Sequence, residues 1–176
     1  MSLSIATPPA IQDLKLASKA TLGSANATIT ATIPSGYRYL RVVLYGVTTG
    51  DTGVGSRLKL LINGAVTNYR SRSWYVLTTT FGADAGSITD GIAVGAPQVG
   101  VAMRFMMTAD IIAPINSKKM ITGEGAATEE GTETSTNRFF FMGESDETAD
   151  VTSISIVLPA STWTTATELR VYGGEN

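Results

Sequence analysis

Leu40-Arg41-Val42-Val43-Leu44-Tyr45-Gly46 decides the fold, because Glu168-Leu169-Arg170-Val171-Tyr172-Gly173 repeats its pattern more than a hundred residues later. Each stretch is an apolar run that carries an arginine and stops at a glycine directly after a tyrosine. Val, Leu and Tyr at this density are typical of β-strands, whereas Gly weakens a strand. We therefore predict two strands that are neighbours in one sheet. The pattern describes architecture and contains no catalytic group.

Two longer segments alternate apolar and polar residues with the period of a strand that buries one face. They run from Val101 to Ile115 and from Val151 to Leu158. The predicted core positions are Met103, Phe105, Met107, Ala109, Ile111, Ile154, Ile156 and Leu158. Phe139 to Met142 adds another apolar strand.

Turn and loop residues separate these segments. Asn63-Gly64 lies between two strand-like runs and predicts a type I′ hairpin, since both central residues of that turn need positive φ. Residues 82–100 form a Gly/Ala/Asp segment that we expect to hold one short helix or strand. Residues 123–137 have no large apolar side chain, so we expect a mobile exposed loop.

The composition fits one globular domain. The chain has 176 residues, of which 43% are hydrophobic and 16% are charged. We expect an extended arm over residues 1–12, where Pro8 and Pro9 are candidate contacts to a partner, and one domain over residues 13–176. About eight strands at hairpin spacing, without a long helix, predict an all-β fold: an antiparallel β-sandwich, with a jelly roll as its version.

Little in the sequence points to chemistry. With no His and no Cys, the chain lacks the usual triads, the thiolate nucleophile and the commonest metal ligands. An acidic turn from Glu144 to Asp150 could hold a hard cation such as Ca²⁺, but most such turns are only solvated. Glu124, Glu129, Glu130 and Glu133 could supply the carboxylate pair of a glycosidase, but their Gly-rich surroundings lack rigid support. We therefore assign no catalytic residue, metal or cofactor, and expect a protein that is not an enzyme.

Aromatic residues leave a binding role open. Tyr69, Trp74 and Tyr75 could form a platform for sugar rings, with Trp163 on a separate loop. Alternatively, Trp74 and Tyr75 point to opposite faces of one strand and one of them enters the core. Trp74, Tyr75 and Trp163 are thus candidate contacts for a ligand or a partner.

The net charge of −2 is unevenly distributed. Residues 1–76 hold eight Lys/Arg and two Asp/Glu, whereas residues 77–176 hold five and thirteen. These opposite charges could attract neighbouring copies, or interleaved strands could mix them within one molecule. The acidic balance disfavours nucleic acid as a partner. No apolar run is long enough for a membrane helix, and no signal-peptide pattern precedes the domain, so we expect synthesis without export.

Several motifs follow one another along most of the chain. They are Ile33-Pro34-Ser35-Gly36-Tyr37, Leu40 to Gly46, Leu58 to Ile62 with Asn63-Gly64 and Asn68-Tyr69, Thr152 to Ile156, and Leu169 to Gly173. Their order resembles a group of small virion proteins of tailed bacteriophages. The resemblance implies a jelly-roll accessory protein of the head or tail, often a homotrimer, without assigned catalytic residues.

Three functions are consistent with these observations. The first is a capsid decoration or cement protein, made in the host cytoplasm and bound in the virion to other virion proteins such as the major capsid protein. The second is a tail-fibre or baseplate protein that contacts the host. The third, from a different class, is a carbohydrate-binding module that uses Trp74, Tyr75 or Trp163.

Overall fold

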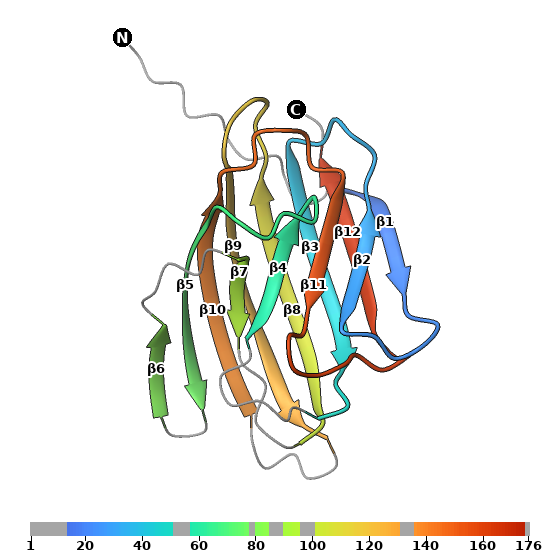
Figure 1. Ribbon diagram of the computed structural model, residues 1–176, viewed down its shortest axis with the longest axis vertical. Coiled ribbons are helices and arrows are strands. Elements are labelled where there is room, and N and C mark those ends of the chain that lie inside the picture. The colour runs from blue at the N-terminus through green and yellow to red at the C-terminus, as the bar shows by residue number, and fades with distance from the viewer. Residues whose placement is uncertain are drawn as a thin grey trace.

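The computed structural model of the chain describes residues 14–50, 57–77, 80–84, 90–95, 101–130 and 136–174. These residues contain twelve strands and no helix, in two antiparallel sheets packed face to face (Figure 1). The strands are β1 (Lys15–Thr21), β2 (Thr28–Thr32), β3 (Tyr39–Val47), β4 (Leu58–Ile62), β5 (Tyr69–Leu77), β6 (Thr80–Asp84), β7 (Ile92–Gly95), β8 (Met103–Ile112), β9 (Lys119–Glu129), β10 (Thr136–Ser145), β11 (Ser153–Val157) and β12 (Glu168–Gly174). The predicted β-sandwich is confirmed, while the proposed arm with Pro8 and Pro9 lies outside the described residues.

Eight of the strands form a jelly roll. The large sheet has the order β1-β12-β3-β8-β9-β10-β5-β6, and the small sheet has the order β2-β11-β4-β7. From β1 to β4, and again through β7, β8, β11 and β12, the chain alternates between β1-β12-β3-β8 and the small sheet, as in a jelly roll. The pairs β5–β6 and β9–β10 widen the large sheet. The prediction of about eight strands therefore matches the jelly roll, but it does not include the four additional strands β5, β6, β9 and β10.

The two Tyr-Gly strands are neighbours, as predicted. β12 pairs antiparallel with β3, with Leu169 opposite Leu44 and Tyr172 opposite Arg41. Leu44 and Leu169 are completely buried because both face the small sheet, whereas Arg41 and Tyr172 alternate to the other face. β12 lies between β1 and β3, so the last described strand completes a sheet that the first one began.

The alternation of β8 and β11 also predicts the core correctly. Every predicted core position is at most 1% exposed: Met103, Phe105, Met107, Ala109, Ile111, Ile154, Ile156 and Leu158. Trp163 is completely buried among them, with its ring edge-on to Phe105 at a centroid distance of 5.6 Å. The sheets thus share one core.

The Asn63-Gly64 turn exists, but the predicted hairpin does not. Asn63 and Gly64 have φ values of 52° and 67°, as a type I′ turn requires. The strands on either side nevertheless separate, since β4 belongs to the small sheet and β5 to the large one. The turn therefore carries the chain from one sheet to the other.

Side-chain hydrogen bonds explain this outcome. The Asn63 side-chain oxygen accepts a hydrogen bond from the Thr152 backbone N–H at 2.8 Å, which ties the turn to the start of β11. The buried Tyr69 hydroxyl accepts a hydrogen bond from the Ile62 backbone N–H, also at 2.8 Å. In place of a hairpin ladder, β4 is thus joined to the neighbouring strand β11 of the small sheet, and one bond from Tyr69 crosses the sandwich.

The predicted loop over residues 123–137 is wrong for its first seven residues, which belong to β9, and for its last two, which begin β10. A Cβ atom on Gly123 would lie 2.2 Å from Cζ of Phe141, and one on Gly125 would lie 2.4 Å from Cζ of Phe139. The glycines therefore make room for core rings from β10, and their small size reflects packing. The segment 82–100 contains the end of β6 and the buried strand β7, so its short element is a strand.

Candidate interaction surface

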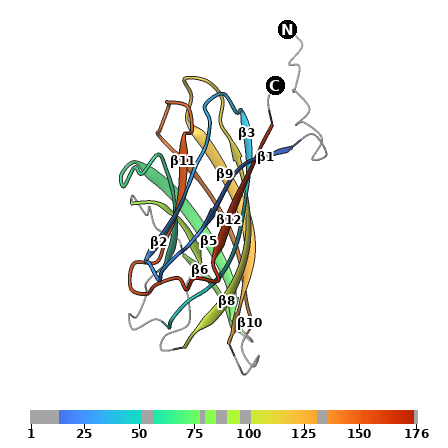
Figure 2. The same ribbon diagram turned by 90° about the vertical axis from the view of Figure 1, so that its right-hand side faces the viewer.

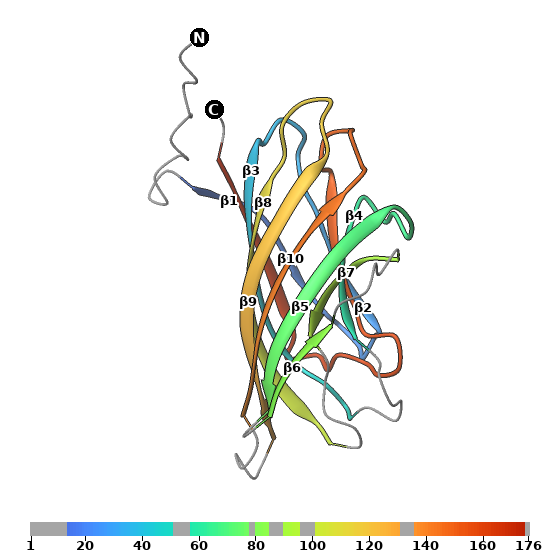
Figure 3. The ribbon, with the colours of Figure 1, turned by 90° about the vertical axis from the view of Figure 1, so that its left-hand side faces the viewer.

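One face of the large sheet is uncovered within the described residues. The small sheet packs on its other face only, as the two side views show (Figures 2 and 3). We call the uncovered side of β3, β8, β9, β10 and β5 the outer face. Six large apolar side chains on it are between 48% and 63% exposed: Tyr45, Met106, Ile112, Met120, Phe140 and Met142. Apolar side chains gathered on one face mark an interaction site more often than scattered ones do.

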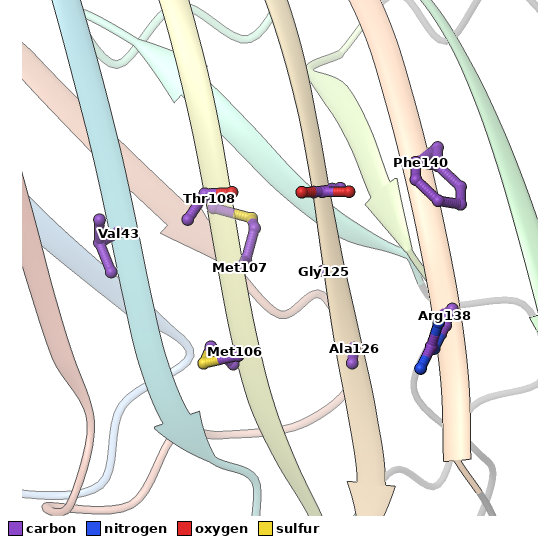
Figure 4. Close-up of a pocket in the computed structure, with 9 residues that line it drawn as sticks. Val43, Met106, Met107, Thr108, Gly125, Ala126, Arg138 and Phe140 are labelled. Atoms are coloured by element: carbon purple, nitrogen blue, oxygen red, sulfur yellow. The ribbon is translucent and has the colours of Figure 1, made fainter. Parts of the chain in front are cut away.

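The antiparallel register aligns the outward side chains in rows across the strands. One row consists of Val43, Thr108, Glu124, Phe140 and Trp74. The next row consists of Tyr45, Met106, Ala126, Arg138 and Val76. A shallow hollow lies over both rows, and Figure 4 shows its lining side chains from four adjacent strands. These two rows are mainly apolar, with Glu124 and Arg138 as their charges.

A third row, which begins with Arg41 on β3 and Asp110 on β8, carries an ion pair whose two charges neutralise each other. Nε and Nη2 of Arg41 donate to Oδ1 and Oδ2 of Asp110 at 2.7 and 2.8 Å, and Nη2 also donates to the Tyr39 hydroxyl at 3.3 Å. Partial burial raises the pKa of Asp110, but hydrogen bonds from Arg41 and Tyr39 and the charge of Arg41 outweigh it, so the net pKa lies below its usual value. Asp110 is therefore ionised and paired at neutral pH, a state that suits structure better than acid catalysis.

Glu124 and Arg138 differ from this pair. They lie on adjacent strands, Glu124 opposite Phe140 and Arg138 opposite Ala126, and are therefore diagonal neighbours. Neither side chain forms a hydrogen bond or an ion pair with any other residue that the structure describes. Two opposite charges thus border Phe140 on the outer face and are open to a partner.

The structure separates the aromatic residues that were predicted to act together. Trp74 lies on the outer face beside Phe140, whereas the ring of Tyr75 covers Gly82 on the inner side. Tyr69 and Trp163 are buried in the core, which corrects the assignment of Trp163 as a contact residue. The Tyr69-Trp74-Tyr75 platform therefore does not form, and the prediction of opposite faces is confirmed.

The outward direction of Tyr45, Met106 and Phe140 was not predicted. Each of them lies in a continuous apolar run, in which outward and core side chains have the same character. The signal lay in alternation: these three residues stand between positions that are buried. Phe140, for example, stands between the buried Phe139 and Phe141.

The acidic candidates occupy other positions. Lys118 pairs with Glu144 at 3.4 Å and with Asp146 at 2.5 Å, and Asp150 accepts a hydrogen bond from Arg38 at 3.1 Å. Among the described residues, no three acidic side chains gather closely enough to hold a metal ion. Glu129 ends β9 and Glu130 follows it, both away from Glu124, and Glu133 lies outside the described residues.

The uneven charge of the sequence is mixed within one molecule. Five ion pairs between described residues join the basic first part of the chain to its acidic second part: Lys19–Glu168, Arg38–Asp150, Arg41–Asp110, Lys59–Asp90 and Arg70–Glu144. Interleaved strands bring these partners together, so of the two alternatives for the charge, mixing is the one that the described residues support.

None of the described residues forms a helix with the length and apolarity needed to cross a membrane. Comparison of the chain with protein-family models, with characterised proteins and with solved structures gives no match.

Proposed function

We propose that this chain is a non-enzymatic structural protein of a tailed-bacteriophage virion, specifically a capsid decoration or cement protein on the outer shell. The observation that carries the proposal is a jelly roll whose widened sheet leaves an apolar outer face uncovered. Jelly rolls recur in viral capsid proteins, and exposed apolar faces bind other proteins. The expected partners are other copies, in a homotrimer, and virion proteins such as the major capsid protein.

The paired charges support a structural role. Arg41 and Asp110, the ion pair at the β3 end of the third row, neutralise each other and bond β3 to β8. A catalytic carboxyl group is more often held with a raised pKa near the operating pH, whereas the pKa of Asp110 is lowered. The outer face therefore offers shape and apolar contact in place of an acid or base.

Localisation and copy number test the proposal. Antibodies against the purified chain should label the heads of virions released by cells that carry its gene. Quantitative mass spectrometry of those virions should then give copies on the order of hundreds per particle, as a shell lattice requires. A copy number near that of a tail fibre would favour the tail or baseplate alternative, and absence from purified virions would overturn the proposal.

A carbohydrate-binding module is the second candidate, because Trp74 and Phe140 lie directly opposite each other on β5 and β10 of the outer face. Adjacent aromatic rings stack on sugar rings. A glycan array should then show binding that Trp74→Ala abolishes and Val66→Ala, an exposed change outside the outer face, preserves. Without binding by the wild-type chain to any glycan, this candidate fails.

A further inference from the structure

We infer that the β5–β10 part of the outer face binds an anionic polysaccharide, whose sugar rings stack on Trp74 and Phe140 and whose carboxylates pair with Arg72 and Arg138. The inference specifies the ligand of the carbohydrate-binding candidate and rests on that candidate, and it does not depend on the presence of the chain in a virion. It is carried by the positions of these four side chains on two paired strands.

The arginines lie at opposite ends of the aromatic pair. Trp74 on β5 is directly opposite Phe140 on β10, and each ring is preceded two residues earlier by an arginine, Arg72 or Arg138. Because the strands are antiparallel, the line that joins the two arginines crosses the sheet between the two rings, over roughly 14 Å of backbone. The shallow hollow of the outer face reaches Phe140 and Arg138 (Figure 4). A linear polymer on this line meets a cation, two rings and a second cation.

Both arginines are available to a ligand. Arg72 and Arg138 are exposed, and neither forms a hydrogen bond or an ion pair with another residue in the described ranges. A guanidinium group donates two parallel hydrogen bonds to a carboxylate, which makes it well suited to an anionic sugar. The three other arginines of the outer face already have acidic partners: Arg41 pairs with Asp110, Arg70 with Glu144, and Arg104 with Glu130.

The charge near the rings favours an anion in spite of one carboxylate. Glu124 lies opposite Phe140 on the β9 side, so it borders the group without separating the two arginines. Arg72, Arg138 and Glu124 together carry a net charge of +1, in a chain whose net charge is −2. The group is thus locally positive on an acidic protein, and Glu124 reduces the affinity for an anion.

Strand pairing favours a polysaccharide over a peptide. β10 pairs with β9 and β5, and β5 pairs also with β6, so an extended peptide cannot add here as a further strand. Its own backbone groups would lose water without gaining partners. A pyranose ring places its apolar face on an aromatic ring and keeps its hydroxyl groups in water. Single-stranded nucleic acid also stacks on aromatic rings, but it needs a longer positive groove than two arginines beside Glu124 provide.

Protein partners retain a separate part of the outer face. Tyr45 on β3 and Met106 and Ile112 on β8 are exposed and lie outside the aromatic pair and its arginines. Contacts to other copies or to virion proteins through β3 and β8 therefore leave β5 and β10 accessible to a glycan.

Titration calorimetry with polygalacturonate, alginate and hyaluronan, each beside its methyl ester, tests the ligand class. At least one polymer should bind ~10-fold more tightly than its uncharged ester, and salt at about 0.5 M should weaken this binding. Equal affinity for polymer and ester would overturn the inference and leave the carbohydrate candidate intact. If no polymer binds with a Kd below about 1 mM, the inference also fails, and the glycan array decides separately about the candidate.

Substitutions test the roles of the side chains. Arg72→Gln and Arg138→Gln should each lower the affinity for the anionic polymer roughly 10-fold and change the affinity for its ester little. Trp74→Ala should lower both affinities. Glu124→Gln should raise the affinity for the anionic polymer about 2-fold, because it removes a repelling charge. A loss of affinity on Glu124→Gln, or none on either arginine substitution, would contradict the proposed contacts.

Matched controls separate binding from general effects. Arg170→Gln and Tyr45→Ala change an exposed arginine on β12 and an exposed aromatic residue on β3, and both should leave the affinity unchanged. An equal loss in these controls would contradict the assigned site, and tighter binding of oligo-dT than of any polymer would overturn the inference in favour of nucleic acid. All variants should keep the circular dichroism spectrum of the wild type, since none of the substituted side chains belongs to the core.

Discussion

Lys119 places a positive charge inside the protein. The side chain is completely buried, and its Nζ donates hydrogen bonds to the carbonyl oxygens of Pro114, Ser117 and Thr148 at 2.9, 2.8 and 3.2 Å. These carbonyls belong to the β8–β9 turn and to the segment before β11. A single ammonium group therefore holds two loops together and satisfies three acceptors.

Lys119→Met should destabilise the protein by about 2–4 kcal/mol, because it removes the donor from three buried carbonyls. Urea unfolding at neutral pH measures this change. Lys118→Met removes an exposed ion pair one residue earlier and should change the free energy of unfolding much less. Equal effects of the two substitutions would contradict the role given to Lys119.

The pH dependence of this difference has a definite sign. Burial lowers the pKa of Lys119 from its ordinary value of 10.5, so in the window between the two values the unfolded chain binds more protons than the folded one. The contribution of Lys119 to the free energy of unfolding therefore rises with pH across that window. The stability difference between the wild type and Lys119→Met should increase towards pH 10.5, and a decrease would contradict the lowered pKa.

Asp110 gives the opposite dependence. Its folded pKa is lowered, so its stabilising contribution is present above the unfolded value of 3.8 and is lost as the pH falls through the folded value. Because Asp110 is 34% exposed, screening reduces this contribution, and Asp110→Asn should cost about 0.5–1 kcal/mol at pH 7. Urea unfolding from pH 7 down to about pH 2 should show the wild type and the variant converge. A difference that persists unchanged in acid would have another cause.

At the scale of the elements, the alternation of apolar and polar residues predicts more of the structure than turn motifs do. The alternation in β8 predicts its buried side from Met103 to Ile111, because only one register places all these residues in the core. Asn63-Gly64 predicts its local φ values but not the partner of β4, which depends on Tyr69 and on distant Thr152. Local chemistry determines the turn, and contacts with residues distant in the sequence determine the pairing.

Gly125 shows how a strand can be concealed in a sequence that looks like a loop. A Cβ atom there would lie 2.4 Å from Cζ of Phe139 and 2.6 Å from the backbone oxygen of Met106. Gly125→Ala should therefore destabilise the protein by about 1–3 kcal/mol, although Ala is normally better than Gly inside a strand. Gly23→Ala is the control, since no atom lies within 4 Å of its Cβ position, and thermal unfolding should barely change. Stabilisation by Gly125→Ala would show that the ring moves freely.

At the scale of the whole molecule, the topology was partly predictable and the outer face was not. The repeated Tyr-Gly pattern predicts that β3 and β12 are neighbours because their buried residues match position by position. The outer face depends on β9 and β10, which place Glu124 beside Phe140 in space although 16 positions separate them in the chain. No local period contains that information, since it arises only when four strands align.

β12 should be indispensable for folding, because it lies between β1 and β3 and contributes the buried Leu169 and Val171. A chain that ends at Thr167 should show no cooperative thermal transition by circular dichroism. A chain that ends at Gly174 keeps all twelve described strands and should unfold as the wild type does. A cooperative transition without β12 would mean that β1 can be detached from the sandwich at little cost.

The insertion of β12 between β1 and β3, and of β11 between β2 and β4, also sets an order in time. A ribosome makes the outer members of each group of three long before the strand that joins them, so neither sheet can close during most of synthesis. Both sheets can therefore close only after residues 153–174 have been made, so the last two described strands complete the fold.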